Sequence, residues 1–312
     1  MAVNLKGRDL LTLGDLTLEE IIQILEYAQT LKLKHFAGEQ HRLLKGKNIA
    51  MIFQKPSLRT RVSFEIGAEH LGAHAVYLAP DDIKLGDREG VADTAKVLSR
   101  YADCIVARVL EHKTVVDLAE FASVPVINAL CDTYHPCQVL ADLLTIWEKK
   151  GEFDGLKLAF IGDGNNMCNS LMLGCSAVGM DVSIATPPGY EPNPTIVERA
   201  REIGSAGGAE ILIGNDTKEA LKDADVVYTD VWTGMGQEDE ADKRRKDFAG
   251  YGLNAELVSV AAPDTTILHC LPAHYDEEIT FDLVHEDPRS AVFDQAENRM
   301  HVQKSVLALL VR

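Results

Sequence analysis

The feature that most constrains the fold is a regular alternation of short apolar runs with segments of helical spacing. Such alternation predicts a parallel sheet that is covered by helices on both faces. The runs expected as strands are 48–53, 75–78, 104–109, 124–128, 157–161, 181–185, 210–213, 225–229 and 266–270. At 312 residues the chain is long enough for two domains of ordinary size. We therefore expect an α/β protein of two domains, each a parallel sheet flanked by helices.

The helical segments place the division between the two domains. A helix is expected from Gln138 to Lys149, and the alternation restarts after it. The last helix, over 296–312, has an apolar face that we expect to be buried against the first domain. The predicted domains are thus 1–149 with 296–312, and 150–295. A long charged stretch at 234–251 interrupts the pattern, as lids and other mobile segments often do.

Composition excludes several classes of partner. The chain has 31 Lys and Arg against 48 Asp and Glu, a net charge of −17, so nucleic acid and acidic membranes are poor candidates. The first residues lack the apolar core of a signal peptide, and no apolar run is long enough for a membrane span. The six cysteines show no Cys-x-x-Cys spacing, so we expect reduced thiols and a cytoplasmic protein.

The stretch from Ser57 to Arg61 predicts an anion site. It lies between the strand at 48–53 and a helix that ends at Gly72. A helix start attracts anions through its N–H groups and its dipole, and Ser57 or Thr60 can cap it. Arginine side chains add paired donors that fit phosphate oxygens. For a single Ser or Arg we would favour a capped, solvated helix end, but the whole cluster favours phosphate binding.

Other polar groups follow the remaining strands. Ligands bind beyond the carboxyl ends of strands in open parallel sheets, so we expect these groups to face one another across the cleft between the domains. In the first half they are Arg108 and 135–138, and in the second half they are 163–166, 230–235 and 269–272. Asp230 is suited to a cationic amine, although a solvated Asp at a turn is the alternative.

Three other interpretations are weaker. His135 with Cys137 and His269 with Cys270 suggest zinc, but structural zinc sites use tighter paired spacings and more ligands. A Cys270 nucleophile activated by His269 is disfavoured because adjacent strand residues point to opposite faces. The turn at 162–166 resembles a dinucleotide fingerprint, but it lacks a third glycine and Asp163 would repel a pyrophosphate.

Taken together, these stretches resemble the aspartate/ornithine carbamoyltransferase superfamily, and most closely its ornithine branch. The resemblance covers nearly the whole chain. It is carried by Ser57-Leu58-Arg59-Thr60-Arg61, His135-Pro136-Cys137-Gln138, Asp163-Gly164-Asn165-Asn166, Asp230-Val231-Trp232-x-x-Met235-Gly236, His269-Cys270-Leu271-Pro272 and Glu297-Asn298-Arg299. The resemblance implies two parallel α/β domains joined by two helices, with the active site in the cleft between the domains. It also implies trimers with active sites at the subunit boundaries.

The resemblance further implies transfer of the carbamoyl group of carbamoyl phosphate to the δ-amine of L-ornithine, with no metal or organic cofactor. The residues implied to bind carbamoyl phosphate are Ser57, Leu58 (through its backbone), Arg59, Thr60, Arg108, His135, Gln138, Cys270, Leu271 (through its backbone) and Arg299. Those implied to bind ornithine are Asn166, Asp230, Gly234 and Met235 (through its backbone). The implied catalytic group is Thr60, Arg108, His135 and Cys270.

Two positions depart from the family pattern. Gly234 stands where the family has Ser before Met235, so a hydroxyl contact to the α-amino group is lost. This leaves open another amine, such as putrescine or a modified ornithine. Lys84 stands where the ornithine branch usually has Gln, and it is similar to the lysine that the aspartate branch lends to a neighbouring subunit. We hypothesise that Lys84 reaches the phosphate of an adjacent active site.

Overall fold

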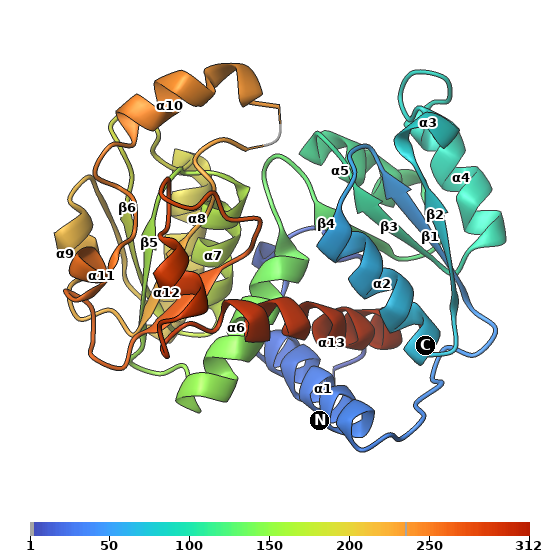
Figure 1. The fold of residues 1–312 in the computed structure, drawn as a ribbon. Coiled ribbons are helices and arrows are strands. Elements are labelled where there is room, and N and C mark those ends of the chain that lie inside the picture. The colour runs from blue at the N-terminus through green and yellow to red at the C-terminus, as the bar shows by residue number, and fades with distance from the viewer. Residues whose placement is uncertain (1–2, 235) are drawn as a thin grey trace. The chain divides into compact units, whose positions relative to one another are not determined.

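The computed structural model describes residues 3–234 and 236–312. The chain divides into two compact units, residues 1–144 with 297–312 and residues 145–296. Each unit contains one sheet of parallel strands with helices on both faces (Figure 1), as the alternation predicts. Within the described residues, no helix is both long enough and apolar enough to cross a membrane.

The first unit has a four-stranded sheet with the order β2-β1-β3-β4. Its strands are β1 (Asn48–Phe53), β2 (His74–Leu78), β3 (Cys104–Arg108) and β4 (Val126–Leu130). Its helices up to β4 are η1 (Leu13–Asp15), α1 (Leu18–Phe36), α2 (Leu58–His70), α3 (Pro80–Ile83), α4 (Val91–Tyr101) and α5 (His112–Phe121). Side chains of α4 and α5 pack on one face of the sheet, against alternate strand residues such as Ala50 and Ile52. The central strands β1 and β3 are buried along nearly their whole length, which is the reason that they read as continuous apolar runs.

Two local predictions in this unit are wrong. The strand expected at 124–128 begins two residues later, at Val126, because Pro125 has no N–H to donate to a ladder. The polar residues from Pro80 to Gly90 predict a loop after the strand at 75–78, but this segment opens with the single-turn helix α3. Lys84 ends this helix in the left-handed conformation, with φ 45°.

The second unit has a five-stranded sheet with the order β7-β6-β5-β8-β9. Its strands are β5 (Lys157–Ile161), β6 (Asp181–Ala185), β7 (Ile211–Gly214), β8 (Val226–Thr229) and β9 (Thr266–His269). Its helices are α7 (Asn166–Ala177), α8 (Pro194–Gly207), α9 (Thr217–Leu221), η2 (Glu238–Glu240), α10 (Ala241–Asp247), α11 (Ala255–Val258) and α12 (Phe281–His285). The apolar side chains of α9, α11 and α12 form one core with β5, β8 and β9.

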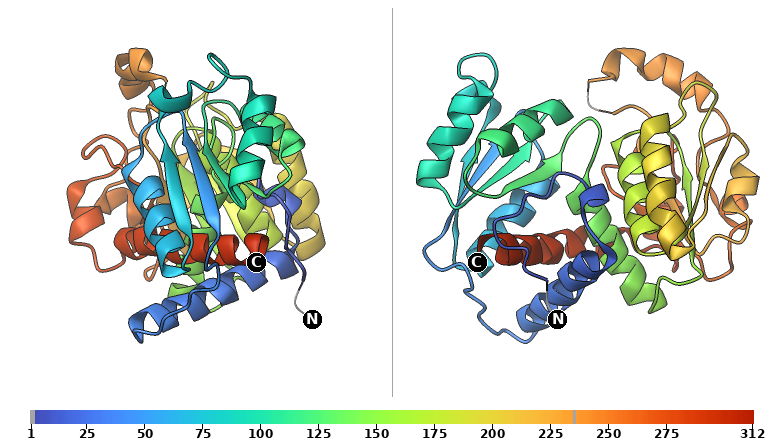
Figure 2. Two further views of the ribbon diagram at one scale, coloured as in Figure 1. Left: turned by 90° about the vertical axis from the view of Figure 1, so that its right-hand side faces the viewer. Right: turned by 180° about the vertical axis from the view of Figure 1, so that it is seen from behind.

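Two helices contain the divisions between the units: α6 (Pro136–Lys150) and α13 (Val292–Val311). The sequence placed the divisions at 149/150 and 295/296, whereas the compact units divide at 144/145 and 296/297. A division inside an unbroken helix leaves no mark in the sequence, since helical spacing continues through it. The C-terminal part of α13 is buried in the first unit, as predicted, and Figure 2 shows it beside α1.

A fully buried lysine lies where α13 packs on α1. Lys304 is 0% exposed, and its Nζ lies 3.4 Å from both the carbonyl oxygen of Leu31 and Nε2 of His41. The Lys304 Cγ also packs on Gly67 of α2, where an added Cβ would lie 3.3 Å from it. Burial lowers the pKa of Lys304 to about 8, because the apolar surroundings disfavour the ammonium form.

Replacing Lys304 with methionine should therefore stabilise the fold by roughly 3 kcal/mol at pH 7, since the pKa falls from 10.5 to about 8 and one pKa unit corresponds to about 1.4 kcal/mol. The lowered pKa makes the ammonium costly at every pH below about 8. As pH rises from about 8 toward the ordinary value of 10.5, the folded chain loses this proton first and the wild type recovers stability. Urea unfolding at both ends of this range measures the difference. The exposed Lys45→Met is the control, and equal effects of the two substitutions would contradict the argument.

Candidate functional site

The start of α2 forms the first part of the candidate site. Ser57 caps the helix, and its Oγ accepts a hydrogen bond of 3.3 Å from the N–H of Thr60. Ser57 itself is extended, with φ −155°, as an N-cap residue usually is. Leu58 is 74% exposed. The local prediction of a capped helix after a buried strand is confirmed.

Two arginines from distant parts of the chain converge on the Thr60 hydroxyl. Arg108, at the end of β3, donates to Thr60 Oγ1 over 3.4 Å, and Arg299 of α13 donates to the same atom over 3.2 Å. Both arginines are buried, at 9% and 2% exposure. A hydroxyl has two acceptor positions and one proton, so the Thr60 proton remains available for a ligand. The two guanidinium groups repel each other, and an anion placed against them would relieve this repulsion.

The beginning of α6 supplies two more of the predicted residues. Gln138 is buried, accepts from Arg299 Nη1 over 2.5 Å, and donates to Asp142 Oδ1 over 2.8 Å. His135 is 5% exposed, and burial together with the charges of Arg299 and Arg108 holds the pKa of its imidazole well below the ordinary value. His135 is therefore neutral near pH 7 and can donate a hydrogen bond without carrying a charge.

Other predicted members of this group are placed differently. Arg59 is half-buried, and its charge contributes to the lowered pKa of His135. Arg61 points elsewhere: it pairs with Glu65 over 3.0 Å and lies 3.7 Å over the Tyr77 ring. Lys84 is exposed, and among the described residues no hydrogen bond or ion pair joins its side chain to the group around Thr60. Any role for Lys84 therefore stays a prediction.

In the second unit, the candidate site is built around Asp230, which follows β8. Asp230 is 7% exposed. Its Oδ2 accepts from Asn165 Nδ2 over 2.8 Å, and its Oδ1 accepts from the Val231 N–H over 2.8 Å and from Cys270 Sγ over 3.0 Å. A carboxylate has about four acceptor positions, and these contacts occupy three of them. The remaining position on Oδ2 suits a cationic amine.

The residues expected beside Asp230 come from two turns. Asn166 is the first residue of α7, after Asn165, whose side chain caps the helix by accepting from Met167 N and Cys168 N. The N–H of Gly234 donates to Gln237 Oε1 over 3.0 Å. Met235, the predicted backbone contact to a carboxylate, lies outside the described residues.

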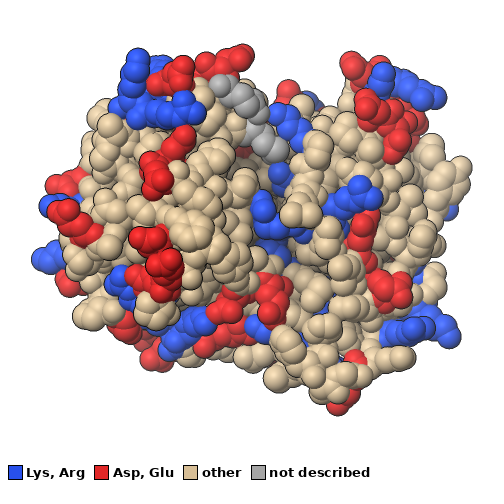
Figure 3. Space-filling view, viewed as in Figure 1, with Lys and Arg blue, Asp and Glu red and all other residues tan. Residues whose placement is uncertain are grey.

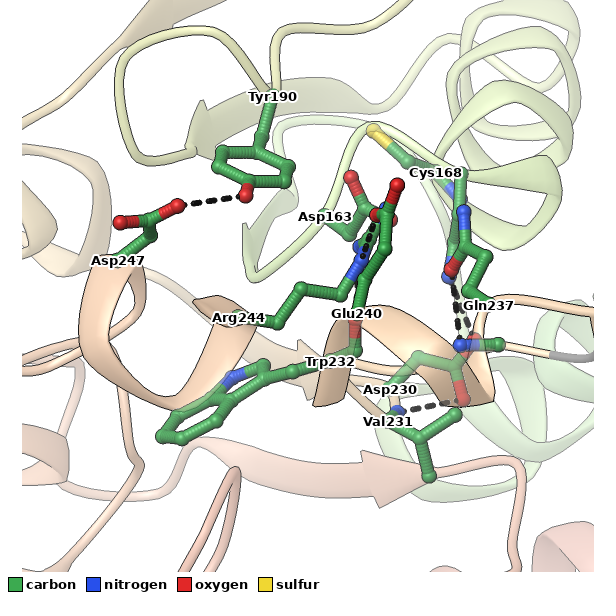
Figure 4. Close-up of polar contacts among 12 residues, drawn as sticks. Asp163, Cys168, Tyr190, Asp230, Val231, Trp232, Gln237, Glu240, Arg244 and Asp247 are labelled. Atoms are coloured by element: carbon green, nitrogen blue, oxygen red, sulfur yellow. Dashed lines mark hydrogen bonds and ion pairs between the residues drawn. The ribbon is translucent and has the colours of Figure 1, made fainter. Parts of the chain in front are cut away.

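A buried ion pair fixes the predicted mobile stretch at one point. Arg244 of α10 is 5% exposed, and it donates from Nη1 to Asp163 Oδ2 over 2.7 Å and to the Trp232 carbonyl over 2.8 Å (Figure 4). Burial raises the pKa of Asp163, and the hydrogen bond from Arg244 offsets part of this rise. Elsewhere α10 is exposed, and Figure 3 shows its acidic and basic side chains next to one another. The charge of Asp163, which argued against a dinucleotide site, is therefore paired with Arg244. This ion pair attaches α10 to the turn that follows β5.

The adjacent residues His269 and Cys270 point in different directions, as predicted. His269 is fully buried and its Nε2 lies 3.1 Å from Glu278 Oε1, whereas the Cys270 thiol contacts Asp230. The Leu271 N–H donates to His269 Nδ1 over 2.8 Å, so His269 holds the backbone of the next predicted site residue. Leu271 has φ 56°, a left-handed conformation that this hydrogen bond helps to maintain.

The alternative readings gain no support from this geometry. Cys137 is buried and donates to the Asn128 carbonyl over 3.4 Å, and burial raises the pKa of its thiol to about 12, which opposes metal binding as a thiolate. Among the described residues, neither His135 with Cys137 nor His269 with Cys270 belongs to a group of three possible metal ligands. No disulfide joins any of the six cysteines.

Sequence reasoning assigned no role to three residues that organise these groups, although one of them, Asn165, lies in the predicted stretch 163–166. Arg244 lies in a run of charged residues, and nothing in the sequence distinguishes it from Lys243 or Arg245. Asp142, which orients Gln138, looks like any polar residue of a helix. Asn165 could have been found, since an Asn directly before a helix is a typical cap.

The two groups have complementary chemistry. The group around Thr60 offers guanidinium, hydroxyl and neutral imidazole donors, which suits an anion that also carries a carbonyl oxygen. The group around Asp230 offers a buried carboxylate, which suits an amine. The predicted position of both groups in one cleft between the domains stays a prediction.

Comparisons with known proteins agree with this division of chemistry. Residues 8–148 match the family described as "Aspartate/ornithine carbamoyltransferase, carbamoyl-P binding domain", and residues 154–310 match its "Asp/Orn binding domain". The chain is 55% identical over 311 residues to ornithine carbamoyltransferase of Pyrococcus abyssi, covering 100% of this chain and 98% of the relative. It is 54% identical to the "anabolic" ornithine carbamoyltransferase of Pyrococcus furiosus. The solved structure of the P. furiosus enzyme matches with a TM-score of 0.96 over 99% of this chain and 98% of that one.

Proposed function

Because the chain belongs to the aspartate/ornithine carbamoyltransferase family, we propose that it transfers the carbamoyl group of carbamoyl phosphate to the δ-amine of L-ornithine, giving L-citrulline and phosphate. The observation that carries this proposal is the convergence of Arg108 and Arg299 on Thr60 at the start of α2. It supplies a site for a phosphorylated donor, and full-length relatives at this identity are named for this reaction.

The phosphate is assigned to the start of α2 and the arginines. Ser57, the Leu58 backbone, Arg59 and Thr60 surround the helix start, where the N–H groups and the dipole favour a dianion. Arg299 adds a second guanidinium from α13. As the carbamoyl bond to phosphate breaks, these groups stabilise the charge on the departing oxygen.

The carbamoyl oxygen is assigned to Thr60, Arg108 and His135. Attack by the amine turns this oxygen into an oxyanion, and donors already directed at it lower the barrier, each by about 2.7–4 kcal/mol. The Thr60 proton is not used by its two arginine partners, and the neutral His135 has an N–H to give. Gln138 binds the carbamoyl amino group, and Cys270 with the Leu271 backbone completes this set.

The amino acid is assigned to the second unit. Asp230 takes the α-amino group through its remaining acceptor position, and Asn166 with the Met235 backbone takes the carboxylate. The δ-amine must lose its proton before it attacks, although a free alkyl amine titrates near ~10.4. Desolvation and nearby cations favour the neutral amine.

The decisive assay measures phosphate release from carbamoyl phosphate with different amines. Ornithine should be the preferred acceptor, and putrescine, N-acetylornithine, lysine and aspartate should each react much more slowly. Gly234 is the reason to test putrescine and modified ornithine, because it lacks the family hydroxyl near the α-amino group. If putrescine were the preferred acceptor, it would replace ornithine as the proposed substrate. If no amine caused phosphate release, the proposal would be refuted.

We propose further that the protein works in the cytoplasm as a trimer in which Lys84 serves the site of an adjacent subunit. Lys84 is exposed and directly follows α3, and this exposure supports a contact with another subunit. The loop is attached to β1 through Gln54, whose side chain contacts the Leu85 carbonyl and the Leu110 N–H. This attachment would fix the position of the loop, and with it that of Lys84, relative to β1.

The substitution Lys84→Gln should lower kcat/KM for carbamoyl phosphate by about 10-fold or more, because a hydrogen bond to a charged partner contributes about 1.5–3 kcal/mol. Steady-state kinetics with Arg88→Gln as the control measures this, since Arg88 is exposed on the same loop. Mixing Lys84→Gln with Arg59→Ala subunits should restore part of the activity if the sites are shared. Unchanged kinetics would contradict the role of Lys84, and failure of the mixture would contradict sharing.

A further inference from the structure

A second cluster of ligand-type side chains lies in the loop that follows β9. His274, Glu277 and Glu278 each place one ligand atom within 4.8 Å of the other two. His274 is exposed, Glu277 is partly exposed and Glu278 is fully buried, so the cluster runs from the surface into the core. None of the three residues has a role in the proposed reaction.

Among the described residues, the carboxylate of Glu277 accepts a hydrogen bond at one oxygen only. Arg245 donates from Nε to Glu277 Oε1 over 2.8 Å. The other oxygen, Oε2, lies 3.9 Å from His274 Nδ1, a separation that makes no hydrogen bond. Two neighbouring ligands of a tetrahedral ion with bonds of about 2.1 Å are about 3.4 Å apart. A shift of about half an ångström would therefore bring these two atoms to ligand spacing.

The carboxylate of Glu278 repeats this arrangement inside the core. Its Oε1 accepts from His269 Nε2 over 3.1 Å and from the His274 N–H over 2.6 Å. Its Oε2 is buried and has no hydrogen-bond partner among the described residues. A buried carboxylate oxygen without a donor is costly, and a cation would compensate it.

Within the part of the chain that the structure describes, both carboxylates thus have one oxygen fixed by a donor and the other without a protein donor. This is how metal ligands are commonly oriented, with outer hydrogen bonds fixing the ligand before the ion arrives. We propose that His274, Glu277 and Glu278 bind a divalent transition-metal ion. One imidazole with two carboxylates suits Zn²⁺ or Mn²⁺ better than Mg²⁺ or Ca²⁺, which prefer oxygen ligands alone.

The ion would act on the loop that carries Leu271. Glu278 contacts His269, and His269 Nδ1 accepts from the Leu271 N–H. An ion on Glu278 would therefore hold the hydrogen-bonded chain that maintains the left-handed Leu271. The site is a stabilising or regulatory one, because the proposed carbamoyl transfer uses no metal.

Binding is tested with Mn²⁺, which has low affinity for thiols and so avoids Cys270. Electron paramagnetic resonance measures the free Mn²⁺. The loss of this signal when the wild-type protein is added should correspond to one bound Mn²⁺ per chain. His274→Gln should weaken this binding at least 10-fold, and Glu277→Gln should weaken it as well. The control His74→Gln removes an exposed histidine from the other unit and should bind like the wild type. An excess of Zn²⁺ should displace the bound Mn²⁺, whereas the same concentration of Mg²⁺ should not.

A thermal unfolding series gives a readout that does not involve catalysis. Mn²⁺ should raise the unfolding temperature of the wild type and of His74→Gln, but not of His274→Gln, since an ion that binds only the folded chain stabilises it. Absence of stoichiometric binding at millimolar Mn²⁺ would overturn the site. Wild-type affinity in both His274→Gln and Glu277→Gln would do the same.

Discussion

Replacing Thr60 with valine should lower kcat by about 10²–10³-fold, which is the usual effect of removing one donor to a developing oxyanion. Valine keeps the shape of threonine but removes the hydroxyl on which Arg108 and Arg299 converge. It also removes the proton that we assign to the carbamoyl oxygen. Because the loss falls on the transition state, kcat should change more than KM for carbamoyl phosphate.

The matched control is Thr94→Val. Thr94 lies on α4 in the same unit and is 4% exposed, and its hydroxyl has no hydrogen-bond partner among the described residues. The same chemical change there should leave kcat unaltered. A Thr60→Val enzyme with wild-type kcat would remove Thr60 from the catalytic group, and an equal loss in Thr94→Val would indicate a general effect on folding.

The substitution Asp230→Asn should raise KM for ornithine by about 10- to 150-fold, which corresponds to the loss of one hydrogen bond to a charged group, about 1.5–3 kcal/mol. The amide keeps the size of the carboxylate but cannot pair with the α-ammonium group. Carbamoyl phosphate binding should change little, because its assigned phosphate ligands lie in the other unit. Initial rates at varied ornithine, and calorimetry with carbamoyl phosphate alone, measure the two effects.

The matched control for Asp230 is Asp181→Asn. Asp181 begins β6 of the same sheet, at the amino end of a strand, and its Oδ1 accepts from the Glu210 N–H over 2.8 Å. Loss of the Asp181 carboxylate should lower the stability of the fold but leave the KM for ornithine unchanged. If Asp230→Asn kept the wild-type KM for ornithine, the amine would have to bind elsewhere, and the assignment of the second half-site would be wrong.

Much of the fold could be predicted because local patterns carry it. The strands at 48–53, 157–161 and 181–185 begin and end at the predicted residues, since each is a compact apolar run bounded by polar residues. The capping box that starts α1 at Thr17 is also a local pattern, because a cap and its partner lie three residues apart. The start of β4 near Pro125 and the helix α3 in the 80–90 segment were predicted wrongly, because the backbone conformation at a single residue decided where each element begins or ends.

Part of the candidate site could also be read from the sequence. Each predicted group follows an apolar run, and the carboxyl ends of parallel strands are where ligands bind. Family resemblance then gave Arg299 and Cys270 their expected roles. Their partners could not be read, because the pairs Arg299–Gln138 and Cys270–Asp230 join residues far apart in the chain.

The sequence by itself determined the α/β class, the order of the strands along the chain and the turns at which chemistry-bearing residues lie, because all of these depend on neighbours within a few residues. Only the tertiary structure decided that Arg108 and Arg299 share one hydroxyl and that Arg244 is the arginine of α10 that reaches Asp163. It also decided that one oxygen of Glu278 has no donor among the residues described. These facts depend on which segments the packed core brings together, and spacing along the chain does not encode them.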